Sequence, residues 1–392
     1  MYIGYTPEQE ALRDRLRVYF DELMTPELRE ECERDREGGG PLFREAMKQM
    51  GRDGWLGIGW PVEFGGQNRS AIEQFIFGNE VRRTGFPLPF LTLDTVGPTI
   101  ARFGSEEQKQ FFVPKILAGE IFFAIGYSEP SAGTDLAALT TRADRQGDEW
   151  VINGQKVFTS YADYADYIWL AARTDPEARK HAGISIFLVP TTAPGYSFSL
   201  IRTMSEMDTY ATYYEDVRLP ASGLVGPENG GWGLMTNQLN RERVGIADSG
   251  PEEDLYRRII DYARERRLAD GTRLIDRPRV RQNLGRVRAG LEANRLIRWK
   301  QAWATANDQL DPAGASAAKV YGSEFSIEAI RLLGEIAGQA GNIRAGSPEA
   351  VLQGQLEQAY RTASLAAFGG GTNEIQRDLI STVGLEMPRA SR

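Results

Sequence analysis

The first 120 residues carry apolar side chains at helical spacing. A helix is predicted to begin at Thr6, because Pro7 and Gln9 supply a first-turn proline and a capping-box partner. An apolar stripe then recurs every three or four residues, at Leu12, Leu16, Tyr19, Phe20 and Leu23. Further helices are predicted at residues 41–51, up to residue 80, at 95–103 and at 106–117, with a turn-rich connector at 55–66. No strand pattern precedes residue 121, so this part is predicted to be helical.

From residue 121 the pattern changes to short β-rich runs. Asn153-Gly154 lies between two such runs and predicts a type I′ hairpin, and more strands are predicted at 167–171, 183–189 and 211–219. Another apolar run begins at Phe122 and is broken at Ser128 by a loop of small residues that extends to Asp135. Two interpretations of this loop remain open: a plain turn, or a loop that presents hydroxyl and amide groups to a ligand. The recurring turn signals predict a small antiparallel β domain.

Helical spacing returns after Gly231 and continues almost to the end of the chain. Helices are predicted at residues 232–247, 252–267, 279–306, 313–337 and 348–367, and a last one ends at Ser381. The predicted fold class is therefore α+β with several domains. Its parts are an N-terminal helical domain (1–121), a middle antiparallel β domain (122–231) and a C-terminal four-helix-bundle domain (232–392).

Composition excludes several functional classes. The 392-residue chain has a net charge of −8 and no long basic run, which argues against nucleic-acid binding. Cys32 is the only cysteine and His181 the only histidine, so neither an intrachain disulfide nor a metal site is predicted. No apolar run approaches about 18 residues and no signal-peptide pattern is present, which predicts a cytoplasmic protein without membrane insertion.

With a single histidine, a carboxylate is the expected acid–base group. Glu242 lies between Arg241 and Arg243 on a predicted helix, where it is either an ion-pair member or a base tuned by its neighbours. The segment 369–373 is either a helix–helix turn or a glycine loop whose helix start holds an anion. No G-x-G-x-x-G follows a strand and no G-K-[ST] occurs, so neither a Rossmann nor a P-loop site is supported.

The motifs taken together resemble those of the acyl-CoA dehydrogenase family along nearly the whole chain. They occur in the family's order, as GSEEQKQFFVPKILAGE (104–120), YSEPSAGTD (127–135), WVINGQKVFTS (150–160), YYEDVRLP (213–220) and GGTNEIQR (370–377). The resemblance implies FAD between the β domain and the C-terminal bundle, and an acyl-CoA thioester as substrate. It also implies a reaction in which a carboxylate removes the α-proton while the β-hydrogen leaves as hydride to flavin N5, giving a trans-2-enoyl-CoA. Electron-transfer flavoprotein is the implied acceptor.

The resemblance also assigns residues to the cofactor site. It implies that Tyr127 and Ser128 line the isoalloxazine and that Gly133 and Thr134 lie near the flavin and pyrophosphate. Other positions implied to touch the cofactor are Phe158 in place of the usual tryptophan, Ser160 in place of threonine, Thr372, and Glu374 in place of glutamine.

Three departures from the family pattern carry further implications. Gly370 occupies the position where many members have their catalytic glutamate, whereas Glu242 falls on the alternative position used by a minority, beside Arg243. The usual R-x-x-F-G signature is not recognisable between residues 262 and 284, and 335–339 replaces the usual Q-x-x-G-G loop. Because these signatures complete a neighbour's FAD site, the resemblance is strongest to actinobacterial two-component enzymes of steroid side-chain degradation, in particular the catalytic-type subunit. These enzymes are α2β2 assemblies with half the usual FAD.

Two other functions stay open at this point. The chain could be a non-catalytic subunit that supports FAD binding in a heteromeric acyl-CoA dehydrogenase, which Gly370 favours and Glu242 opposes. It could also be a flavin oxidase or monooxygenase on the same fold. A homo-oligomer is the alternative to a heteromer with a second dehydrogenase-like subunit.

Overall fold

The computed structural model describes residues 4–246, 250–307, 309 and 311–388, without the side chains of 240–246 and of 305–306. Contacts within the chain divide it into two compact units. The first unit comprises Met1–Thr203 with Met207–Glu242, and the second comprises Arg243–Arg392 with the short segment Met204–Glu206.

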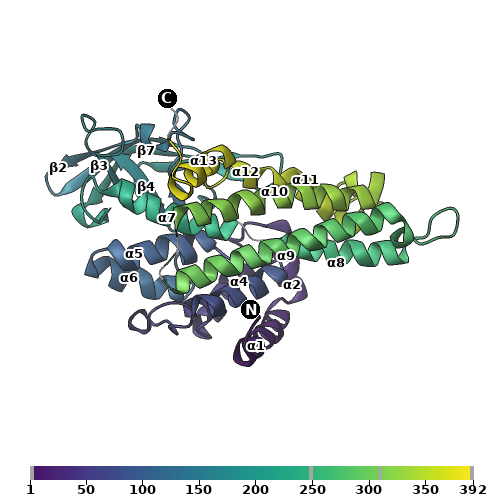
Figure 1. The fold of residues 1–392 in the computed structure, drawn as a ribbon. Helices are drawn as coiled ribbons and strands as arrows, with labels where there is room; N and C mark the ends of the chain where they lie inside the picture. Colours follow the sequence, from purple (N-terminus) through teal and green to yellow (C-terminus); the bar gives the residue numbers. More distant parts are fainter. Residues whose placement is uncertain (1–3, 247–249, 308, 310, 389–392) are drawn as a thin grey trace. The chain divides into compact units, whose positions relative to one another are not determined.

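The first unit begins with the helices that the apolar spacing predicts (Figure 1). Thr6 caps α1 and forms the predicted capping box with Gln9. The stripe on α1 buries Leu12, Leu16 and Phe20. One helix, α2, was not predicted. It lies in a stretch rich in charged residues, and Thr25 caps it by accepting a hydrogen bond from the Leu28 amide. The helices of this part are α1 (Pro7–Leu23), α2 (Pro26–Arg34), α3 (Pro41–Arg52), α4 (Ala71–Arg83), α5 (Gly97–Phe103) and α6 (Glu106–Leu117).

The β region forms one sheet with strand order β6-β7-β3-β2-β4-β5-β8, and β1 pairs with β4 outside this path. The β1–β4 pair is parallel, and β2 also meets β4 in parallel, so the sheet is mixed and the expectation of a purely antiparallel domain needs this correction. The strands are β1 (Phe123–Gly126), β2 (Arg142–Gln146), β3 (Glu149–Lys156), β4 (Tyr167–Arg173), β5 (Ile184–Pro190), β6 (Tyr196–Ile201), β7 (Thr209–Pro220) and β8 (Leu224–Val225).

The predicted hairpin at Asn153-Gly154 is wrong, because both residues lie inside β3. The turn is at Gly147-Asp148 instead, between the paired residues Gln146 and Glu149. Gly154 marks a register shift between β3 and β7, and a Cβ atom there would lie 2.5 Å from the Thr141 hydroxyl oxygen. The glycine therefore permits close approach of two backbones within the sheet rather than a chain reversal.

Each face of the sheet is buried against a different core. One face packs on the N-terminal helices, and Trp169 and Leu188 lie in that core together with Phe123. The other face is folded against itself, with the rings of Trp150 and Phe187 5.2 Å apart in an edge-on contact. Successive side chains along each strand point to opposite faces of the sheet and so contribute to both cores. Because a shift by one residue would exchange the two sets of side chains, this alternation fixes the strand registers.

The second unit is a helical bundle in which α10 packs against α8, α9, α11 and α13. The helices are α8 (Gly250–Glu265), α9 (Pro278–Ala306), α10 (Pro312–Ala337), α11 (Gln355–Ala363), α12 (Leu365–Phe368) and α13 (Asn373–Leu379), preceded by α7 (Gly231–Ile246), which crosses the boundary between the units. The helix predicted from residue 348 begins only at Gln355, because Leu352 and Gln353 have positive φ values of 51° and 58°. Among the described helices, none is long and apolar enough to span a membrane.

Candidate cofactor and active site

The loop after β1 forms a tight turn and then lies open to solvent. Glu129 and Ala132 exchange both backbone hydrogen bonds, at 2.9 and 3.1 Å, around a two-residue turn. Gly133 and Thr134 follow on the surface, and neither makes a hydrogen bond within the described part of the chain. Their amide groups and the Thr134 hydroxyl are thus available to a polar or anionic group.

A second segment, residues 157–160, runs beside this loop. The Val157 amide donates a 2.8 Å hydrogen bond to the Ser128 carbonyl, which joins the two segments directly. Phe158 has φ +60° and its side chain is 66% exposed, a strained and solvated conformation for an aromatic residue. The Ser160 hydroxyl lies 3.3 Å from that of Thr209 on β7. Ser128, Phe158 and Ser160 are therefore brought to neighbouring segments of one domain.

Tyr127 occupies a different environment from its neighbour. Its side chain is buried, and its hydroxyl accepts a 2.8 Å hydrogen bond from Trp169 Nε1. The ring packs in the core shared with the N-terminal helices, whereas Ser128 is half-buried at the surface. The assignment of Tyr127 to the isoalloxazine remains a prediction.

Glu129 and Lys156 form a buried ion pair beneath these segments. Their side chains are 2% and 0% exposed, and Lys156 Nζ lies 2.8 Å from Glu129 Oε1. Burial raises the pKa of Glu129, but the Lys156 charge and hydrogen bonds from Lys156 and Thr141 outweigh it and lower the pKa to about 2. The carboxylate is therefore ionised at neutral pH.

The sequence analysis did not single out this pair as part of the site. The available signal was a lysine near the end of a β-strand whose alternate side chains point inward. An inward lysine requires a buried partner, and the loop glutamate is that partner.

The second unit contains the glycine loop between α12 and α13. Gly370 and Gly371 have φ values of +64° and +95°, which favour glycine. Thr372 caps α13 by accepting a hydrogen bond from the Ile375 amide at 3.3 Å. Glu374 follows in the first turn with an exposed side chain, and its pKa is lowered by its own backbone amide and the Thr372 hydroxyl.

A buried polar cluster supports this loop from α10. Lys319 Nζ donates to the Ala367 carbonyl at 3.0 Å and to Asn373 Oδ1 at 2.7 Å, so it links the two sides of the glycine loop. Asn373 Nδ2 also donates to the Ser323 hydroxyl at 3.0 Å. The loop that carries Thr372 and Glu374 therefore rests on a defined hydrogen-bond network.

The predicted base and its neighbour lie on α7, which follows the β domain as expected. The backbone of Glu242 and Arg243 is helical. Their side chains lie outside the described residues. At the other candidate position for a base, in the glycine loop, Gly370 has no side chain and cannot supply one.

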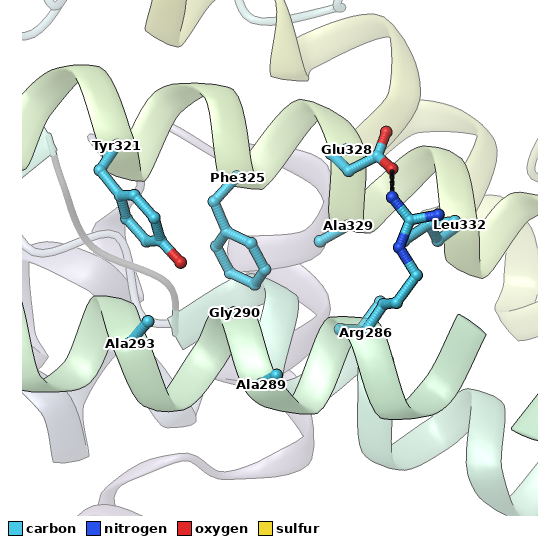
Figure 2. Close-up of a pocket in the computed structure, with 10 residues that line it drawn as sticks. Arg286, Ala289, Gly290, Ala293, Tyr321, Phe325, Glu328, Ala329 and Leu332 are labelled. Atoms are coloured by element: carbon cyan, nitrogen blue, oxygen red, sulfur yellow. Dashed lines mark hydrogen bonds and ion pairs between the residues drawn. The ribbon is translucent and has the colours of Figure 1, made fainter. Parts of the chain in front are cut away.

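A shallow groove of about 470 Å³ lies between α9 and α10 in the second unit (Figure 2). Tyr321 and Phe325 stack along it with ring centroids 6.2 Å apart, and Phe325 covers Gly290 on the facing helix. An ion pair of 2.9 Å between Arg286 and Glu328 closes one end. Among the described side chains, none of those predicted to bind the cofactor lines this groove.

Groups of side chains that could hold a metal ion are absent from the part of the chain that the structure describes. His181 is exposed, and its ring contacts Trp232 edge-on at a centroid distance of 4.5 Å. Cys32 is a buried free thiol.

Comparison with protein families matches the chain over three segments. Residues 6–120 match the acyl-CoA dehydrogenase N-terminal domain, 124–217 the middle domain and 229–385 the C-terminal domain. These matches confirm the predicted three-domain architecture of helices, sheet and helices. The family is FAD-dependent in general.

Similar proteins and structures extend over the whole chain. The acyl-CoA dehydrogenase FadE26 of Mycobacterium tuberculosis is 52% identical and FadE29 is 48% identical, and each match covers all of both chains. A chain in the crystal structure of the ChsE4-ChsE5 complex from Mycobacterium tuberculosis superposes with a TM-score of 0.93 at 52% identity, again over the full length of both. A chain of the Tcur3481-Tcur3483 steroid ACAD gives 0.92 at 50% identity with the same coverage. The chain therefore belongs to the acyl-CoA dehydrogenase family of flavin-dependent oxidoreductases.

Proposed function

We propose that this acyl-CoA dehydrogenase is the catalytic subunit of a heteromeric enzyme that acts on the CoA ester of a steroid side chain. The product would be the trans-2-enoyl-CoA. The proposed substrate class rests on the similarity to a chain of the Tcur3481-Tcur3483 steroid ACAD, which extends over the full length at 50% identity. The similarity to a chain of the ChsE4-ChsE5 complex supports a second subunit.

FAD is the proposed cofactor, and residues of the first unit fit such a ligand. In the first unit, Phe158 presents an exposed aromatic ring on the segment that is hydrogen-bonded to Ser128, and Gly133 and Thr134 on the Ser128 loop have amides without a partner in the described part of the chain. These features suit a planar ring system with a polar edge and a phosphate. The residues proposed to hold FAD are Tyr127, Ser128, Gly133, Thr134, Phe158, Ser160, Thr372 and Glu374. When bound, FAD supplies the acceptor for the hydride that leaves the β-carbon.

Glu242 is the proposed base for the α-proton. Proton abstraction next to a thioester requires a positioned carboxylate, and Gly370 leaves none at the position in the glycine loop. Glu242 lies on α7 directly after the β domain, with Arg243 beside it. The proposed role of Arg243 is to hold the carboxylate ionised by its charge. The proposed electron acceptor is an electron-transfer flavoprotein.

The test of the proposed base is Glu242→Gln in the complete heteromer. The variant should retain its flavin, but substrate-driven bleaching of the visible flavin absorbance should slow by about 10²–10⁴-fold, because the amide cannot accept the proton. Glu253→Gln is the matched control, since Glu253 is an exposed glutamate on α8. Stopped-flow absorbance with a steroid-side-chain CoA ester, under anaerobic conditions, gives the rate.

Other outcomes would separate the competing functions. Undiminished bleaching in Glu242→Gln would remove Glu242 from the reaction. Little activity in the unsubstituted complex, with no effect of the substitution, would favour a non-catalytic supporting subunit. Rapid reoxidation of the reduced flavin by air would favour an oxidase or monooxygenase.

A further inference from the structure

We infer that the buried Glu129–Lys156 ion pair is a positioning device that holds the two cofactor-facing segments, 127–134 and 157–160, in register with each other. The inference rests on the proposed FAD site, and it concerns residues that would act through others rather than touch the cofactor.

Lys156 directly precedes the second segment in the chain and contacts the first segment at two atoms. Its ammonium donates to the Tyr127 carbonyl at 3.1 Å and to Glu129 Oε1 at 2.8 Å. The next residue, Val157, donates its amide to the Ser128 carbonyl at 2.8 Å. Tyr127, Ser128 and Glu129 are thus held by contacts from the consecutive residues Lys156 and Val157, and Phe158 follows immediately.

Glu129 secures the other end of the loop. One carboxylate oxygen, Oε2, accepts from the Thr140 amide at 2.7 Å and from its hydroxyl at 2.8 Å. Oε1 accepts from the Thr141 amide at 2.8 Å in addition to Lys156. The exposed residues Gly133 and Thr134 lie between these attachment points, so the pair fixes both ends of the loop that carries them.

The chemistry of the pair points to positioning more than to stability. A buried ion pair adds little net stability relative to apolar side chains of the same volume, because desolvation offsets most of the attraction. Hydrogen bonds to a carboxylate and an ammonium are directional, however, and each of the contacts named above specifies one backbone or side-chain atom. An apolar pair could fill the same space without specifying where Ser128 and Phe158 lie.

The experiment uses the complete complex of this chain with its second subunit, and the variants Lys156→Met, Glu129→Gln and the double variant. Apo-protein is titrated with FAD by fluorescence quenching to obtain Kd, and visible circular dichroism of the bound flavin reports its environment. We expect Kd to rise by about tenfold or more in the single variants, with an altered dichroism spectrum, as is typical when supports of a binding site are lost. The double variant should recover thermal stability relative to the single variants but not the flavin affinity.

Val189→Ala is the matched control, because Val189 is fully buried in the same domain on β5 and belongs to neither segment. It should lower the unfolding temperature and leave Kd and the dichroism unchanged. A milder variant, Thr140→Val, removes one hydroxyl hydrogen bond to Glu129 at an exposed residue and keeps the buried charges. We expect Kd to rise by about twofold to threefold in this variant, in line with the loss of one hydrogen bond.

Two results would overturn the inference, and they differ from a failure of the proposed function. If folded Lys156→Met or Glu129→Gln binds FAD with unchanged Kd and dichroism, the pair is only structural. If neither variant folds, an unchanged Kd for FAD in Thr140→Val would likewise show that the pair is only structural. If the unsubstituted complex binds no FAD at all, the proposed function fails, and the inference fails with it.

Discussion

The fold shifts the ionisation of Glu129 strongly. This residue is 5% exposed, yet the Lys156 ammonium and the amide donors around it stabilise the charged form. Burial alone would raise the pKa of Glu129, but the Lys156 charge and the hydrogen bonds outweigh burial and lower the pKa to about 2. The difference between folded and unfolded states links this residue to stability at acid pH.

Stability should fall as pH decreases from about 4.5 to about 2 because of Glu129. In this window the unfolded chain binds a proton at Glu129 while the folded protein does not, so acid favours unfolding; above about 4.5 the contribution is complete. The size is on the order of 3 kcal/mol for a shift of this extent. Urea unfolding of Glu129→Gln and of the unsubstituted protein at several pH values gives the free energy of unfolding as a function of pH. The contribution of Glu129 is the difference between the two proteins in the slope of this dependence.

Glu149→Gln serves as the control, because Glu149 pairs with Arg218 at an exposed site on the sheet. This substitution should leave the slope of the unfolding free energy against pH nearly unchanged between about pH 2 and about pH 4.5. Identical slopes for Glu129→Gln and the unsubstituted protein would contradict the prediction.

At the scale of elements, α13 and the glycine loop before it depend on backbone conformation. Gly371 has φ +95°, and a Cβ atom there would lie 2.7 Å from Gln376 Nε2. Gln376 is fully buried and its Oε1 accepts a 2.9 Å hydrogen bond from Ser316, so the side chain cannot move away without losing that bond.

Gly371→Ala should therefore destabilise the protein by about 1–3 kcal/mol, from the left-handed conformation and the lost hydrogen bond together. Gly369→Ala is the matched control, because Gly369 has φ −60° and ψ 142°, which any residue adopts. Thermal unfolding of both variants measures the difference. Equal melting temperatures would show that the loop adapts freely.

At the scale of the whole molecule, the proposed assembly decides the FAD content. The chain lacks the recognisable signatures that, in the family it resembles, reach a neighbour's FAD. We expect the chain purified alone to retain substoichiometric FAD, and co-production with its second subunit to give an α2β2 complex with half the usual FAD per chain. Light scattering together with flavin absorbance gives mass and stoichiometry. A stable homotetramer with one FAD per chain would refute the heteromer.

Sequence and structure agree best where the signal is local. The Thr6 capping box and the apolar stripe on α1 were predicted from neighbouring residues and are present. The predicted hairpin at Asn153-Gly154 was wrong because its outcome depends on pairing between strands rather than on neighbouring residues. The same dipeptide suits either a turn or a bulge, and only the pairing of β3 with β2 and β7 selects the bulge.

The candidate site divides in the same way. Motif order predicted the family, which the full-length comparisons confirm, and it assigned the residues that remain predictions for FAD and for the base. The motif order did not reveal the contact between Glu129 and Lys156. The two residues are separated along the chain, and no local sequence pattern indicates that they pair.

Most of the helical and β segments, the family and the absence of a side chain at Gly370 follow from the sequence alone, because spacing, capping and residue identity are local properties of the chain. Only the tertiary structure decided that Lys156 lies under the Tyr127–Thr134 loop and that Phe158 is strained and exposed beside it. These facts depend on strand register and burial, which bring distant residues together and are set by the packing of the whole domain.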